Sequence, residues 1–191
     1  VPKMILMKNL ANADAQWVVY HVGTGNTQAL YLNTTATPTD VLGFFNDTDP
    51  TSSVFTVGTD TAVNGNTNSQ INYAWSDKQG FSKFGSYEGN GNVDGTFVFC
   101  GFRPAYIMIK NADATGNWEI FDTKRSTYNL MHATLYADVA NAEYTGTGNQ
   151  IDVLSNGFKI RLNDTNTNGS GNTHIYAAFA EAPFVNSEGV P

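Results

Sequence analysis

Short apolar runs recur along the whole chain and are separated by clusters of Gly, Asn and Thr. Runs of this length between turn-forming residues are typical of β-strands, and no window of about eleven residues or more sustains a helical period. In 157–162 charged and apolar residues alternate, which indicates a strand with one solvated face. The pattern predicts strands over 3–8, 17–21, 30–32, 54–57, 71–75, 81–87, 96–100, 106–110, 118–122, 151–154, 157–162 and 174–180.

An internal repeat organises these strands. The matching blocks are 2–9 with 104–111, 17–21 with 118–122, and 71–77 with 175–181, at offsets of 102, 101 and 104 residues. We therefore expect an all-β, antiparallel β-sandwich of two tandem related units, 1–77 and 80–184, with 185–191 as a tail or linker. The sequence leaves open whether the units form two sandwiches or share one.

The first unit is expected to lack its N-terminal strand or strands. The second unit begins with Gly80–Tyr87, and the counterpart of this segment would lie before Val1. An unpaired strand edge invites pairing, so a strand donated from elsewhere could complete the first unit.

Composition narrows the partners and the core. Only 14% of residues are charged and the net charge is −7, so there is no basic surface for nucleic acid. No apolar run is long enough to insert into a membrane. Trp17 and Trp118 occupy equivalent places in the repeat, which predicts that both are core residues. Cys100 has no cysteine partner, and we expect it to be a small buried residue.

No catalytic or cofactor-binding residue is predicted. Glu119 and Asp122 are the nearest approach to a glycosidase carboxylate pair, but on a strand they point to opposite faces, so we expect a solvent-facing pair. His21, His132 and His174 lack the spacing of a zinc site and are expected at the surface or in hairpins.

One segment resembles part of a metal-binding loop. Asp164, Asn166 and Asn168, followed by Gly169, match the opening of an EF-hand calcium loop, but Ile175 stands where the bidentate glutamate should be. A polar hairpin is the better interpretation. Weak calcium binding through these three side chains stays open, and no other cofactor is expected.

Several blocks resemble a known family. The segments are 36–40, 51–55, 80–87, 101–104, 154–159 and 176–184. They are similar to tandem-repeat structural proteins of tailed-phage virions, of the tail-fibre type. The resemblance implies concanavalin-like jelly-roll units, a location on the virion surface, and a non-enzymatic role in packing against copies of the chain or other virion proteins.

Two other functions remain open. A carbohydrate-binding or host-receptor-binding module would need exposed aromatic and amide side chains in loops, and the candidates for contact with host-surface glycans are Tyr128, Asn129, Tyr136, Tyr144 and Asn149. A bacterial surface adhesin or filament subunit is the second alternative.

Overall fold

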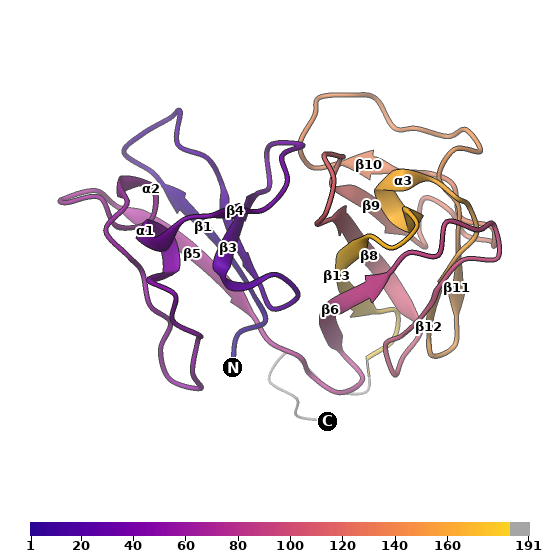
Figure 1. Ribbon diagram of the computed structural model, residues 1–191. Helices are drawn as coiled ribbons and strands as arrows, with labels where there is room; N and C mark the ends of the chain where they lie inside the picture. The colour runs from indigo at the N-terminus through magenta and orange to yellow at the C-terminus, as the bar shows by residue number, and fades with distance from the viewer. Residues whose placement is uncertain (184–191) are drawn as a thin grey trace.

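The computed structural model describes residues 1–183, whose strands form three antiparallel sheets (Figure 1). Sheet 1 has the strand order β4-β3-β2-β1-β5. Its strands are β1 Met4–Asn9, β2 Val18–His21, β3 Gly25–Tyr31, β4 Thr39–Asp40 and β5 Gln70–Trp75. Two short helices, α1 Leu42–Phe45 and α2 Thr61–Asn64, lie between β4 and β5 in the chain.

The remaining strands form sheets 2 and 3. Sheet 2 has the order β10-β9-β8-β13-β6, and sheet 3 has the order β11-β12-β7. Sheet 2 contains β6 Ser82–Glu88, β8 Pro104–Asn111, β9 Glu119–Asp122, β10 Leu135–Tyr136 and β13 Thr173–Ala180. Sheet 3 contains β7 Phe97–Phe99, β11 Ile151–Leu154 and β12 Gly157–Ile160, and helix α3 Thr165–Asn168 precedes β13.

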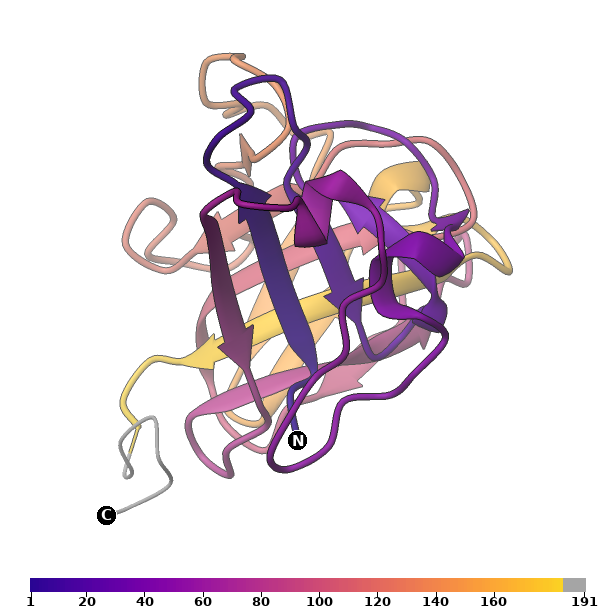
Figure 2. The same ribbon diagram turned by 90° about the vertical axis from the view of Figure 1, so that its left-hand side faces the viewer.

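The three sheets stack in layers, with sheet 2 in the middle. Alternate residues of β8 face opposite sides: Ile107 and Ile109 pack with Phe158 of sheet 3, whereas Met108 packs toward sheet 1. On the other side of sheet 1, α1 and α2 cover Ile5 and its neighbours. In Figure 2 the strands of sheet 1 cross those of sheet 2 steeply.

Sheets 1 and 2 share a pattern of strand neighbours. Strand β1 pairs with β2 and β5, and β8 pairs in the same antiparallel sense with β9 and β13. Strand β3 lies beyond β2, and β10 lies beyond β9. The two sheets differ at the edge beyond β5 and β13. Strand β13 has β6 on its far side, whereas β5 has no further strand beside it among residues 1–183.

The all-β, antiparallel prediction is confirmed, and most predicted strands are present. The strand predicted over 54–57 is wrong. The hydroxyl of Thr51 accepts from the backbone of Val54, and the N–H of Thr51 donates to the Val54 carbonyl. These local bonds occupy groups that a sheet would need, and Val54 is left 64% exposed. The predicted tail, 185–191, lies outside the described residues.

The two equivalent tryptophans differ in burial. Trp118 is a core residue, fully enclosed between sheets 1 and 2, and its Nε1–H donates to the carbonyl of Tyr31 at 2.9 Å. Trp17 is only half-buried, so its assignment to the core was wrong. It precedes β2, and its backbone N–H donates a hydrogen bond to the side-chain oxygen of Asn33. Cys100 is buried as expected, and burial raises the pKa of its thiol to about 12.

Within the described residues, no helix is both long enough and apolar enough to cross a bilayer.

Candidate functional site

The long connection after β9 holds the most exposed aromatic side chain of the predicted glycan set. Tyr128 is 84% exposed and lies on a recess of about 390 Å³. The recess is lined by residues of two connections, the one between β9 and β10 and the one between β10 and β11, namely Arg125, Ser126, Thr127, Tyr128, Asn129, Leu130, His132, Ala133, Glu143 and Thr145. The lining combines the Tyr128 ring and Leu130 with several polar side chains, so the recess offers an apolar surface beside polar groups.

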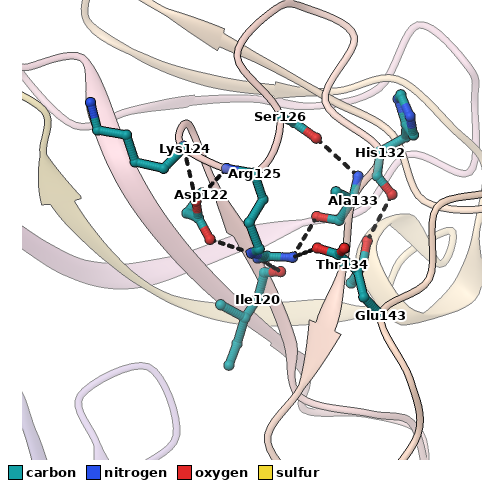
Figure 3. A network of polar contacts seen from close by, with 9 residues as sticks. All are labelled: Ile120, Asp122, Lys124, Arg125, Ser126, His132, Ala133, Thr134 and Glu143. Carbon is teal, nitrogen blue, oxygen red and sulfur yellow. Dashed lines mark hydrogen bonds and ion pairs between the residues drawn. The ribbon is translucent and has the colours of Figure 1, made fainter.

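Arg125 fixes the shape of this recess (Figure 3). Its guanidinium pairs with Asp122 and, at 2.8 Å, with Glu143. It also donates to the backbone carbonyls of Ile120 and Ala133, at 3.0 and 3.2 Å. One side chain thus links β9 to the connections before and after β10. The charged groups of the recess are therefore held in place before a ligand binds.

Asp122 works with Arg125 as the anchor of this network. Burial acts to raise the pKa of Asp122, but hydrogen bonds from the backbone and side chain of Arg125 and from the backbone of Lys124 outweigh it. The pKa of Asp122 is therefore held below its ordinary value. The carboxylate therefore stays charged and bound to Arg125, and its role is structural.

The other four predicted glycan-contact residues are held in internal contacts. Asn129 bonds through both its amide oxygen and its amide nitrogen to the backbone of Val153 at 3.0 Å. Asn149 is buried and donates to the hydroxyl of Tyr136 at 3.3 Å. The hydroxyl of Tyr144 accepts from the backbone of Gly148 at 2.9 Å. Tyr128 is 84% exposed, against 37% for Tyr144, and Asn129 is exposed as well although both ends of its amide are bonded.

Sequence reasoning missed Arg125, Glu143 and His132 as members of this recess. Arg125 and Glu143 lie 18 residues apart in the chain, on either side of β10, and His132 is exposed in the same connection as Arg125. No spacing rule links residues across an irregular connection, so only the tertiary structure brings them together.

Glu119 is not solvent-facing, contrary to the expectation for the Glu119–Asp122 pair. Its side chain is fully buried on the face of sheet 2 opposite to Asp122. Oε1 accepts from the side-chain amide of Asn166 at 3.0 Å. Within residues 1–183, Oε2 has no hydrogen-bond partner. Burial, and after it the charge of Asp164, raises the pKa of Glu119 to about 8, so this carboxyl is mostly protonated at neutral pH.

Two of the three histidines are also buried, against expectation. His21 is enclosed between the sheets, where Nε2 lies 3.1 Å from the carbonyl of Tyr176 and Nδ1 accepts from Gly23. His174 is buried and stacks on Tyr87. Burial lowers the pKa of both imidazoles, to about 4 for His21. His132 alone is exposed, as predicted.

The calcium candidates belong to a helix cap. The carboxylate of Asp164 accepts from the backbone N–H groups of Asn166 and Thr167, at 2.9 and 3.2 Å, and so caps α3. Asn168 is fully buried, and its amide nitrogen donates to the carbonyls of Leu162 and Asn92. The three predicted side chains therefore serve three different internal contacts.

The same cap recurs 104 residues earlier. Asp60 accepts from the N–H of Ala62 at 2.8 Å at the start of α2, and Asn64 donates to the carbonyl of Gly58 as Asn168 does to that of Leu162. The strand ends match too. Asn9 of β1 donates to the carbonyl of Thr61 at 2.7 Å, and Asn111 of β8 donates to that of Thr165 at 2.7 Å.

A family model described as a domain of unknown function (DUF7483) matches residues 1–183, so the chain belongs to that family. No curated protein and no solved structure matches the chain.

Proposed function

We propose that this DUF7483 member is a non-enzymatic structural module of a virion surface protein of a tailed phage, in a tail fibre or a similar appendage. It would act by packing against related units, in the same chain or in its neighbours. The observation that carries the proposal is the packing of sheet 1 on sheet 2: two sheets with the same strand neighbours bury apolar faces against each other.

The recurring cap supports a tandem origin for these two sheets. At the end of β1 in sheet 1 and of β8 in sheet 2, an Asn side chain donates to the carbonyl of the first residue of an Asp-capped helix. The cap, the strand end and the sheet order all recur at nearly constant offsets. We propose that they define two related units of concanavalin-like jelly-roll type, the second carrying an additional layer, sheet 3.

The use of the carboxyl groups near β9 agrees with a structural role. Asp122 is bound to Arg125, Glu119 is buried beneath Asn166, and Asp164 caps a helix. A glycosidase would need two carboxyl groups facing one sugar about 5–10 Å apart. Glu119 and Asp122 instead point to opposite faces of the sheet.

The proposal is tested on particles. Antibodies raised against the purified chain should label appendages of intact phage particles from the source, as seen by immunoelectron microscopy. Antibodies preabsorbed with the chain are the control. Absence of labelling on both intact and disrupted particles, with the protein detected elsewhere in the infected culture, would refute a virion role.

A second candidate function is recognition of a host-surface glycan at the recess beside Tyr128. The supporting observation is the exposed Tyr128 ring next to the charged pair Arg125–Glu143 and the exposed His132. Aromatic rings beside fixed polar groups are a common way of holding sugars. A glycan array should show saturable binding that Tyr128→Ala abolishes and Tyr73→Ala, at another exposed tyrosine, leaves unchanged. A blank array would reject this candidate.

A further inference from the structure

We infer that the outer edge of β5 is an acceptor site for an added antiparallel strand of the β6 type, supplied by a neighbouring unit of the same repeat. This inference rests on the proposed tandem packing and names the surface through which a further unit would join. The experiment that tests it measures hydrogen exchange at the β5 amides and does not depend on where the protein is located.

Within residues 1–183, no strand pairs with the outer side of the β5 backbone. The N–H of Leu10 donates to the carbonyl of Ser69 at 2.9 Å, which sets the phase of the ladder between β1 and β5. Because hydrogen-bonded and non-bonded pairs alternate in an antiparallel ladder, the N–H and C=O groups of Asn72 and Ala74 point away from β1. Both residues are exposed, and Figure 2 shows that sheet 1 ends at β5.

Strand β5 also lacks the features that protect natural edges. Its six residues, Gln-Ile-Asn-Tyr-Ala-Trp, contain no charge and no proline, and its pairing with β1 runs in continuous register without a bulge. Exposed edges usually carry lysine, proline or a bulge that discourages pairing. An unprotected edge of this length is therefore a template for another strand.

An apolar cavity lies beside this edge. Its volume is about 510 Å³, and it opens between sheets 1 and 2. Trp75 of β5 and Leu6 of β1 line it from sheet 1, while Phe84 and Phe179 line it from sheet 2. Tyr73 is 45% exposed and stacks on Trp75, with ring centroids 6.0 Å apart. Alternate side chains of a strand added to β5 would point to this side of the sheet.

The second half of the chain indicates which strand fits. Strand β13 corresponds to β5, and its far edge is occupied by β6 in antiparallel register. There Phe84 of β6 lies opposite Ala177, the position that corresponds to Tyr73. Phe84 faces the space between the sheets. A β6-like strand on β5 would thus place a phenylalanine opposite Tyr73, directed toward the apolar cavity. Main-chain bonds would supply affinity, and the cavity would supply selectivity.

The test supplies such a strand to the full chain. A copy of the sequence of residues 80–88 is fused ahead of Val1 through about 12 Gly/Ser residues, whose mean span of ~20 Å matches a six-residue strand. Hydrogen exchange by NMR then reports on the amides of Asn72 and Ala74. We expect exchange at both amides to slow by at least about tenfold relative to the unfused chain, because an exposed edge amide has gained a partner.

Two variants of the fused chain separate backbone pairing from other effects. Asn72→Pro removes one outward N–H, which proline tolerates at an edge, and should abolish the protection of Ala74. Asn72→Ala removes only the side chain and should keep that protection. A fused donor of the same composition in scrambled order should give no protection.

Three outcomes would overturn the inference. The first is a folded fused chain whose Asn72 and Ala74 amides exchange as fast as those of the unfused chain. The second is equal protection by the scrambled donor. The third is an unfused chain that already protects both amides as a dimer, which would make a second β5 the occupant. Protection without labelling of phage particles would reject the virion role and leave the strand site standing.

Discussion

The buried carboxyl of Glu119 gives a sharp prediction for the substitution Glu119→Gln. Glu119, the first residue of β9, has a fully buried side chain, and within residues 1–183 only its Oε1 accepts a hydrogen bond, from Asn166 at 3.0 Å. Glutamine has nearly the same shape and keeps an oxygen that Asn166 can bond. It cannot ionise, so the substitution removes the titration of this site while leaving the packing in place.

The direction in which the free energy of unfolding changes with pH follows from proton binding. Burial raises the pKa of Glu119 from 4.5 to about 8. Between these values the folded chain keeps a proton that the unfolded chain has released, so the free energy of unfolding falls as the pH rises. With about 1.4 kcal/mol for each pKa unit, Glu119 removes about 3 kcal/mol of that free energy between roughly pH 5 and pH 8. In the glutamine variant this pH-dependent fall in the free energy of unfolding is absent.

The assay is urea unfolding of both chains at several pH values. The difference in free energy of unfolding, variant minus native, should rise by about 3 kcal/mol from roughly pH 5 to pH 8. The amide nitrogen that replaces Oε2 adds an offset, but that offset does not vary with pH. Glu88→Gln, which removes an exposed carboxylate of β6, controls for net charge. Parallel curves for the native chain and Glu119→Gln would refute the reasoning.

Three further predictions concern the core, a histidine and a helix cap. Phe158→Ala, in the fully buried layer between sheets 2 and 3, should lower the free energy of unfolding by about 3–5 kcal/mol in urea unfolding. As the control, Phe99→Ala removes a ring that is 63% exposed and should change the free energy of unfolding by less than about 0.5 kcal/mol. Burial lowers the pKa of His21 to about 4, so its imidazole NMR signals should stay at the neutral position from pH 8 down to about 5, whereas a midpoint near 6.5 would contradict the buried placement. Asp60→Ala removes the carboxylate that accepts from Ala62 and should cost about 1 kcal/mol in thermal unfolding; Asp60→Asn should restore most of it, and equal losses in both variants would argue against a capping role.

Local pattern was enough for the strands and for part of the core. Apolar runs between turn residues located β1, β2, β6, β8, β9 and β13 to within a residue or two, because a strand's side chains alternate between faces whatever lies beyond them. The burial of Trp118 and Cys100 also followed from their surroundings in the sequence.

The wrong predictions of burial share one cause: the sequence does not show which elements cover each face of a sheet. Trp17 and Trp118 match in the predicted repeat, yet only Trp118 lies between two sheets. Glu119 looked like a surface residue, but it is buried on sheet 2 and bonded by Asn166, which lies 47 residues further along the chain. Alternation says which residues share a face, whereas burial depends on what the rest of the chain places over that face.

The candidate recess was even less visible in the sequence. The exposed Tyr128 was identified as a possible contact residue, but Arg125 and Glu143 were not, because an irregular connection has no period that would relate them. By itself, the sequence located most of the β-strands, and it predicted the repeat and a surface without a basic patch. Only the tertiary structure decided which sheet is covered on both faces and which carboxyl groups are buried. It also decided that β5 has no strand on its outer side among residues 1–183, since all of these depend on contacts between distant segments.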